Sequence, residues 1–505
     1  MAALPPLPVP PSPVLAQASP ASSDAAHYPF DTPYLSRTPT LKPLEVDDRN
    51  QSLPVTAGAA DEEGLGEHEG QSLPPIDRGK GAWGFVAAAF LLETFIWGYS
   101  YSFATILVYL ESHDPWQKEG IASLSAVGTT QLGIQFILPL FFTLIFRRYP
   151  ENVKPCMWIS VVVNVGSMLL SSWATQVWQL IILQGVLCGI SGAALYTPVF
   201  LWLSEWWVEK RGLATGIIFA GTGTGGFAFP FLINALLATS PTDGFKWMCR
   251  GWALITLVVF VASAFLIGPR VPPPKRTQGW RFWRERRDRG PWLGGKGELR
   301  SLRNPIFGLM VYAALLSSLS TLPVSINLGL YAASLASSTT TFQRELVVSL
   351  FNLSASIGCA VTGFFSDFSY AHATTMCGLI SGLVALAEWG LAESLEKTYG
   401  FAVLFGFFSQ QVAAWSGAAK DISGSSPHTA TLVFCLFSIV RGVASIVMPF
   451  VSETLYDPEK SGQSATWGSG GFKKMIIFVG ITGFLSAMGG VALQFVRQRR
   501  RKAGK

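Results

Sequence analysis

Long apolar segments separated by short polar ones recur along the chain after residue 80. A helix needs roughly twenty apolar residues to cross the hydrocarbon core of a bilayer. The pattern therefore predicts an all-α membrane protein with twelve transmembrane helices. The expected spans are 83–110, 121–146, 155–174, 177–203, 212–238, 246–268, 304–330, 346–365, 373–393, 399–420, 429–453 and 473–496.

These spans fall into two groups of six, divided by a long basic segment at 269–303. Such a layout is typical of transporters built from two homologous six-helix bundles. We therefore expect one bundle over 81–268 and another over 304–496. Residues 1–80 are rich in Pro, Ser, Asp and Glu, which predicts a disordered cytoplasmic tail, and 497–505 form a basic tail.

The composition agrees with a lipid environment, because only 13% of the 505 residues are charged and 50% are hydrophobic. Soluble domains carry about 25% charged residues, so the class of soluble enzymes is excluded. The sequence contains no recognisable nucleophile–base pair or metal-binding cluster, and we expect neither catalysis nor a cofactor. The six cysteines lie in or beside apolar segments without a CxxC motif, which indicates buried thiols.

Basic residues are concentrated in the loops that follow even-numbered spans, above all at 269–303, and in the tail at 497–505. Lys and Arg accumulate on the cytoplasmic side of membrane proteins. We therefore expect both termini in the cytoplasm, with the plasma membrane favoured over an internal membrane. Segment 279–289 interleaves aromatic residues with arginines, which favours a short helix on anionic lipid over a nucleic-acid site.

The glycine-rich segment at 221–226 matches the G-x-G-x-x-G pattern of dinucleotide-binding proteins. No strand is expected before it and apolar residues surround it, so the context of a nucleotide site is missing. Small residues in a membrane helix instead allow a neighbouring helix to approach closely. We therefore predict a helix–helix contact at this segment.

The sequence at 206–216, Trp-Trp-Val-Glu-Lys-Arg-Gly-Leu-Ala-Thr-Gly, leads into a span rich in small residues that reaches Pro230. This motif resembles the Major Facilitator Superfamily, in particular its monocarboxylate-transporter-like branch. Further stretches that agree with the resemblance are 80–85, 98–103, 441–442 and 449. The resemblance covers about residues 80–496 and implies two six-helix bundles that alternate access to a central site.

The segment Gly363-Phe-Phe-Ser-Asp367 resembles the second-half copy of the superfamily's cytoplasmic-loop motif. In that motif the Asp interacts with a helix end and with nearby basic groups. The resemblance makes Asp367 a gating candidate, together with Lys210 and Arg211. The first-half copy, at 146–151, keeps the positive charge but has neither the Gly nor the Asp, so gating is expected to depend more on one half.

Animal monocarboxylate carriers are known for a substrate-handling Lys in helix one and an Asp/Arg pair in helix eight. At the matching places this sequence has Thr105, Ala355 and Cys359. All three charges are therefore missing. The resemblance supports the fold and does not carry over proton-coupled lactate transport.

Two charged residues, Glu93 and Arg441, lie deepest in the predicted spans, where each charge costs at least a few kcal/mol. Glu93 shares a helical face with Trp97, and Arg441 with Ser438. A guanidinium holds a carboxylate through two parallel hydrogen bonds, so Arg441 is the candidate substrate contact and Glu93 the candidate carrier of a coupling proton. For both residues a structural role between helices stays open.

Other polar side chains within the spans either line the cavity or bridge membrane helices. These candidates are Tyr196, Asn327, Gln131, Gln135, Gln410 and Gln411. Glu388 lies in a span that is peripheral in this fold, and we interpret it as reaching toward the membrane interface.

The sequence thus predicts a secondary transporter, facilitative or a proton symporter, for a small organic solute, with a carboxylate favoured. The expected partners are that solute, protons and membrane lipid, with no nucleic acid and no obligate protein partner. The alternative from another class is a transport-inactive sensor or scaffold that signals through the N-terminal tail. Deletion of the first 75 residues separates the two, since only the signalling protein depends on its tail.

Overall fold

The computed structural model describes residues 73–240, 242–271, 301–335, 340–424, 426–460 and 466–503. By its contacts the chain divides into the units Met1–Gly70 and Gln71–Lys505, and everything below concerns the second unit. The predicted disorder of the N-terminal tail before residue 73 and the predicted lipid-surface helix at 279–289 lie outside the described residues.

Every regular element in these described ranges is helical. The α-helices are α1 (Lys80–Tyr101), α2 (Phe103–Ser112), α3 (Ile121–Arg148), α4 (Val153–Ser171), α5 (Val177–Leu180), α6 (Cys188–Trp206), α7 (Arg211–Leu237), α8 (Gly244–Leu266), α11 (Pro305–Leu335), α12 (Thr341–Val384), α13 (Leu395–Phe408), α14 (Trp415–Ser423), α15 (Pro427–Leu455) and α16 (Lys473–Ala503). The short 3-10 and π turns are η1 (Trp116–Lys118), η2 (Pro150–Asn152), η3 (Ile181–Leu187), η4 (Ala385–Trp389), η5 (Gln411–Ala414), η6 (Pro458–Lys460) and η7 (Ser469–Gly471). The all-helical fold is thus confirmed.

Ten helical runs in the described part of the chain are long and apolar enough to cross a membrane. The predicted spans 346–365 and 373–393 lie on one run, Phe342–Trp389, in which Ser369 alone has non-helical dihedrals (φ −163°, ψ 105°). The predicted span 399–420 is divided among α13, η5 and α14, and each of these pieces is shorter than a membrane crossing requires. Twelve separate spans therefore stay a prediction.

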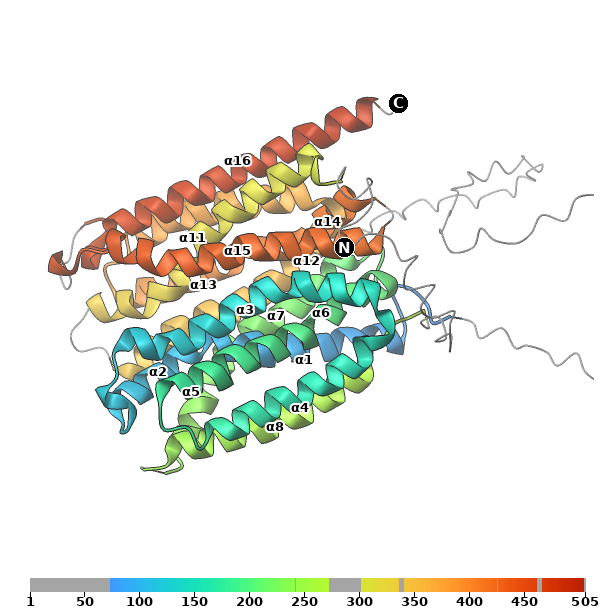
Figure 1. The fold of residues 1–505 in the computed structure, drawn as a ribbon. Coiled ribbons are helices and arrows are strands. Elements are labelled where there is room, and N and C mark those ends of the chain that lie inside the picture. Colours follow the sequence, from blue (N-terminus) through green and yellow to red (C-terminus); the bar gives the residue numbers. More distant parts are fainter. Residues whose placement is uncertain are drawn as a thin grey trace, which may run out of the picture. The chain divides into compact units, whose positions relative to one another are not determined.

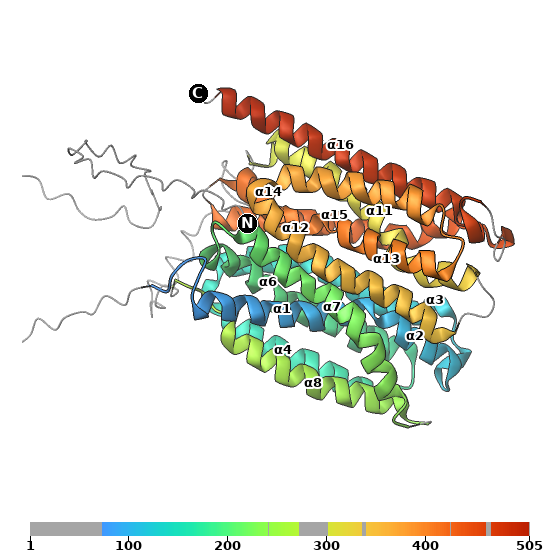
Figure 2. The ribbon, with the colours of Figure 1, turned by 180° about the vertical axis from the view of Figure 1, so that it is seen from behind.

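The helices run side by side along a common direction, with α1 to α8 on one side and α11 to α16 on the other (Figure 1). The view from behind shows the same arrangement (Figure 2). Within the first side α1 packs on α7 and α4 on α8, whereas α12 and α11 both pack on α16 in the second. The most extensive contacts between the sides are those of α7 with α12 and of α3 with α15.

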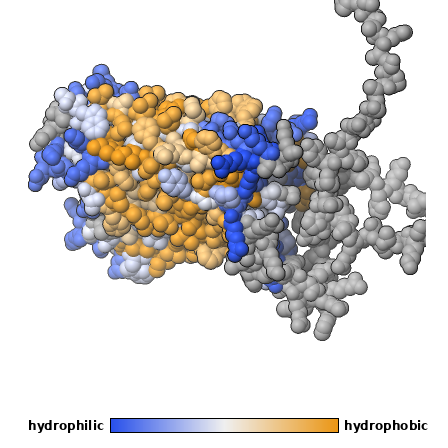
Figure 3. Space-filling model, turned by 90° about the horizontal axis from the view of Figure 1, so that it is seen from above, coloured by the Kyte–Doolittle hydropathy of each residue, from blue (hydrophilic) through white to orange (hydrophobic). Residues whose placement is uncertain are grey.

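A broad band of hydrophobic residues covers the face seen in Figure 3, and hydrophilic residues gather at the two ends of this face. Large apolar side chains project outward from the helices, such as Val108, Val162 and Phe265, which are 67%, 72% and 72% exposed. Lipid accepts such side chains, whereas a soluble monomer rarely exposes so large an apolar surface. The chain is therefore a multi-pass membrane protein.

Glycines of α7 allow both neighbouring helices to approach its backbone. A Cβ atom added to Gly225 would lie 2.7 Å from the Cα atom of Gly98 on α1. A Cβ atom added to Gly223 would lie 2.5 Å from the carbonyl oxygen of Asn352 on α12. The helix–helix contact predicted at 221–226 is therefore confirmed, and α7 joins the two sides along the cavity described next.

Candidate functional site

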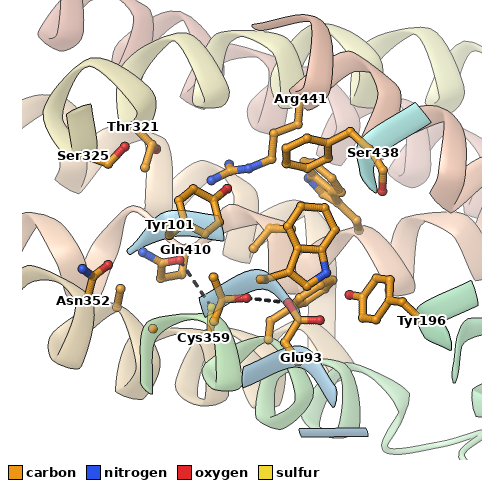
Figure 4. Close-up of a pocket in the computed structure, with 18 of the residues that line it drawn as sticks. Glu93, Tyr101, Tyr196, Thr321, Ser325, Asn352, Cys359, Gln410, Ser438 and Arg441 are labelled. Atoms are coloured by element: carbon orange, nitrogen blue, oxygen red, sulfur yellow. Dashed lines mark hydrogen bonds between the residues drawn. The ribbon is translucent and has the colours of Figure 1, made fainter. Parts of the chain in front are cut away.

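A cavity of about 110 Å³ lies between the two sides of the helical unit (Figure 4). Its polar lining residues are Glu93, Tyr101, Tyr196, Thr222, Thr321, Ser325, Asn352, Cys359, Gln410, Ser438 and Arg441. Its aromatic lining residues, apart from the two tyrosines, are Trp97, Phe136, Phe219, Phe351, Trp415 and Phe434. Aromatic walls with a few convergent polar groups are typical of small-molecule binding sites.

Glu93, which is 1% exposed, brings a carboxyl group from α1 to this cavity. Its Oε1 atom accepts a hydrogen bond from the hydroxyl of Thr222 on α7. Its Oε2 atom is buried and has no partner among the described residues. The sequence prediction found Glu93 but missed Thr222, since a single hydroxyl in a glycine-rich apolar span does not indicate which helix it faces.

Arg441 enters the cavity from α15, on the side opposite Glu93 and Tyr196 (Figure 4). Among the described residues that line the cavity, Arg441 is the single basic residue and Glu93 the single acidic one. No described side chain forms an ion pair with Arg441, which is half-buried. A guanidinium in this position has donors available for a carboxylate or another oxyanion.

Two buried donor groups on the cavity wall also have no partner in the described ranges, namely Trp97 Nε1 and Trp415 Nε1, while the Tyr196 hydroxyl interacts with the Glu93 carboxyl. The rings of Trp97 and Tyr196 are in edge contact, with their centroids 5.7 Å apart. A buried polar group without a hydrogen bond costs about 1–3 kcal/mol. These atoms are therefore positioned to bind water or a ligand.

Gln410 and its neighbour Cys359 close another part of the wall. The Cys359 thiol lies 3.3 Å from Gln410 Oε1, and Gln410 Nε2 donates to the carbonyl oxygen of Gly406 at 2.8 Å. Cys359 and Ala355 both line the cavity.

Some predicted site residues lie away from this cavity. Gln131 and Gln135 border a separate cavity of about 10 Å³ inside the first side, where Gln135 Oε1 accepts from Ser100 at 3.0 Å. Asn327 donates to the carbonyl oxygen of Pro323, one turn earlier on its own helix, at 2.9 Å. Gln135 therefore connects α3 to α1, whereas the Asn327 side chain is bonded within its own helix, α11.

Gln411 and Glu388 also lie outside the cavity lining. Gln411 Oε1 accepts a hydrogen bond from the Ser486 hydroxyl of α16 at 3.3 Å. Glu388 is exposed within η4, which agrees with its interpretation as a residue that reaches toward the interface.

The gating candidates meet where α7 begins. Asp367 of α12 accepts hydrogen bonds from the backbone N–H groups of Gly212 at 2.5 Å and Leu213 at 2.9 Å. The first turn of a helix has unsatisfied N–H groups and a positive dipole end, so a carboxylate is stabilising there. Arg211 is 6% exposed, and its Nε atom has no partner within the described part of the chain. Asp367 thereby links the two sides at this end.

A second carboxylate, which the sequence prediction missed, holds the loop before α7. Asp77 accepts hydrogen bonds from the backbone N–H groups of Val208, Glu209 and Lys210 at 3.0–3.1 Å. Lys420 of α14 donates to the carbonyl oxygen of Val208 at 2.6 Å. Lys210 thus contributes its backbone, while its side chain is exposed.

The chain is similar to several fungal transporters. It is 24% identical over 412 residues to the "Fujikurins efflux protein" of Gibberella fujikuroi, which covers 81% of each chain. It is 26% identical over 352 residues to the "MFS transporter asaE" of Aspergillus flavus, which covers 69% of this chain and 74% of that one. These relatives associate the chain with membrane transport.

Solved structures show the same fold at low identity. The human organic anion transporter MFSD10 aligns with a TM-score of 0.58 at 15% identity, over 81% of this chain and 99% of that one. The E. coli fucose:proton symporter FucP aligns with a TM-score of 0.56 at 12% identity, over 81% and 98%. The sequence model of the Major Facilitator Superfamily matches residues 82–449, which is well over half of the chain. The protein therefore belongs to the Major Facilitator Superfamily.

Proposed function

We propose that this chain is a secondary transporter that moves a small organic carboxylate across a membrane by alternating access, coupled to protons. The observation that supports this most is Arg441, an arginine without an ion-pair partner among the described residues, in an aromatic cavity between the two sides. A planar guanidinium matches a carboxylate through two parallel hydrogen bonds. The substrate is therefore expected to place its carboxylate at Arg441.

Glu93 is proposed to carry the coupling proton. It is the single acidic residue among the described residues that line the cavity, and it lies across from Arg441 (Figure 4). Arginine keeps its charge under all relevant conditions, whereas a carboxyl group exchanges a proton when water reaches it. Alternating access would expose Glu93 first to one compartment and then to the other.

The membrane arrangement that we propose has twelve crossings in two six-helix bundles, on the monocarboxylate-transporter-like branch of the superfamily. The ten long apolar runs support it, provided that Phe342–Trp389 crosses twice around Ser369 and that α13, η5 and α14 together form one crossing. Both termini are placed in the cytoplasm and the protein in the plasma membrane. Asp367, Lys210 and Arg211 then form the cytoplasmic gate.

Uptake by the purified protein in liposomes tests this function. A panel of small carboxylates, with matched neutral amides and amines as controls, is offered with and without an inward pH gradient. We expect accumulation of at least one carboxylate only with the gradient, and no accumulation of its amide. Equal transport of a carboxylate and its amide would contradict the role of Arg441, and accumulation without any gradient would contradict proton coupling.

A further inference from the structure

The end of the cavity that faces Arg441 has unmet hydrogen-bonding capacity of two kinds. Trp97 Nε1 is a buried donor without a partner, and Glu93 Oε2 is a buried oxygen without a partner, in the described ranges. Both side chains belong to α1, one helical turn apart, and both line the cavity. A ligand at this end of the cavity therefore meets an unpaired donor and an unpaired acceptor atom.

Tyr196 adds a third polar atom to this group, because its buried hydroxyl interacts with the Glu93 carboxyl. Its ring touches that of Trp97, with the centroids 5.7 Å apart, and the hydroxyl lies on the same side of the cavity as Glu93 (Figure 4). Trp97 also packs on Phe136, with the centroids 4.6 Å apart. These ring contacts hold the three polar atoms in place, and we refer to Glu93, Trp97 and Tyr196 as the polar end.

The chemistry of the polar end restricts what binds there. An indole N–H only donates, so Trp97 requires an acceptor, while the Glu93 carboxyl accepts in both of its protonation states and also donates when it carries the proton. An ammonium group satisfies Glu93 but leaves Trp97 without a bond, since it has no lone pair to offer. A hydroxyl group accepts from one and donates to the other.

The proposed function places a carboxylate at Arg441, across the cavity from the polar end (Figure 4). The space between is bounded largely by aromatic rings, including those of Tyr101 and Phe351. A cavity of about 110 Å³ has room for about four water molecules at about 30 Å³ each, so its ligand is small, with at most about one ring and two small substituents. From these facts we infer that the substrates are hydroxylated carboxylic acids with an apolar ring or chain between their hydroxyl and carboxylate groups.

This inference rests on the proposed function, because it takes Arg441 as the contact of the carboxylate. On this basis the polar end decides which carboxylates are preferred, and Arg441 decides that a carboxylate is bound at all. The substrate hydroxyl replaces water between Trp97 and Glu93. A site built to hydrogen-bond a hydroxyl discriminates strongly against the analogue that lacks it, because its buried polar groups then lose their partners.

Binding of benzoate, 3-hydroxybenzoate and 4-hydroxybenzoate to the purified full-length protein, measured by calorimetry, tests the inference. We expect one of the hydroxybenzoates to bind at least about tenfold more tightly than benzoate, as two modest hydrogen bonds provide. In Trp97→Phe and Tyr196→Phe, which remove only the polar atoms and keep the rings, that advantage should fall below about threefold. Tyr312→Phe, in which a 42% exposed tyrosine outside the cavity loses its hydroxyl, should keep the full advantage.

The outcomes of this experiment distinguish a failure of the inference from a failure of the proposed function. Circular dichroism and the elution volume in detergent, each equal to that of the native protein, show that the two cavity variants are folded. If the native protein binds benzoate and gains nothing from a hydroxyl at either position, water already satisfies the polar end and the inference is wrong, while the proposed function stands. If Arg441→Lys binds all three acids as tightly as the native protein does, the proposed function fails, and the inference fails with it.

Discussion

The Asp367 carboxylate accepts a hydrogen bond from the backbone N–H of Gly212 at 2.5 Å, and so joins α12 to the first turn of α7. The same carboxylate accepts from Leu213 at 2.9 Å. α7 lines the central cavity through Thr222, ten residues after Gly212 along the helix, so this contact and the site share one helix. Opening at the Asp367 end therefore requires α7 and α12 to separate while each carries part of the cavity wall.

Asp367→Asn should slow transport and leave equilibrium binding of the substrate within about threefold, which corresponds to less than about 1 kcal/mol. An amide still accepts one hydrogen bond but loses the charge that favours the α7 N-terminus. Turnover in liposomes and calorimetric binding check the two halves of this prediction. Asp243→Asn, which alters an exposed ion pair with Lys246, is the matched control. Loss of binding in a folded Asp367→Asn protein would assign Asp367 to the substrate site.

Glu93→Gln should abolish accumulation driven by a pH gradient and preserve exchange of substrate for substrate. Glutamine keeps the shape of the side chain and can still meet the Thr222 hydroxyl, but it cannot take up and release a proton. Liposome assays with and without the gradient measure the two activities separately. Accumulation that still follows the gradient would show that Glu93 is a structural residue and that the coupling proton is carried elsewhere.

Arg441→Lys should fail in both assays and weaken carboxylate binding by about tenfold or more, because an ammonium is a point charge without the planar fork. Calorimetry and exchange measure the two effects. Arg499→Lys makes the same substitution at an exposed arginine near the end of α16, away from the cavity. This variant should leave both binding and transport unchanged. Normal transport by Arg441→Lys would remove the main support for a carboxylate substrate.

Gly225→Ala should lower the free energy of unfolding by about 1–3 kcal/mol, the usual cost of overpacking. Its new Cβ atom would lie 2.7 Å from the Cα atom of Gly98, and backbone cannot move aside as a flexible side chain does. Gly166→Ala on α4 is the control, because nothing lies within 4 Å of its added Cβ atom. Gly166→Ala should leave the free energy of unfolding unchanged or raise it by up to about 1 kcal/mol. Unfolding in detergent micelles compares the two, and equal stabilities would contradict the tight α1–α7 contact.

A cysteine introduced at Gly294, in the basic segment, should stay unlabelled by an impermeant thiol reagent on intact cells and react after permeabilisation. A cysteine at Lys118 in η1, at the opposite end of the helices, should react on intact cells. The reason is the accumulation of basic residues at 269–303, which favours the cytoplasmic side. Labelling of the Gly294 cysteine on intact cells, with the protein in the plasma membrane, would reverse the proposed orientation.

The apolar segments alone are enough to predict a helical membrane protein, because the length of an apolar segment is a local property and the thickness of the bilayer sets the length that a crossing requires. The cost of burying charge is local as well, so Glu93 and Arg441 stand out from the apolar residues on either side of them. The glycines at 221–226 predict a helix contact for a related reason, since a close approach of backbones accounts for so many small residues in one span.

Tertiary structure alone decided which faces meet. A membrane helix that is apolar on all sides gives no periodicity from which its rotation can be inferred. For this reason Thr222 joined the site unpredicted, while Gln131 borders a separate cavity and Asn327 bonds to its own helix. The break at Ser369 falls between the predicted spans 346–365 and 373–393, so the sequence indicated a boundary there, and the structure added the one residue whose dihedral angles leave the helix. The sequence by itself thus determined that the helices of this protein lie in lipid and which charged residues lie within the spans. The packing of the helices decided which of its polar groups share a cavity.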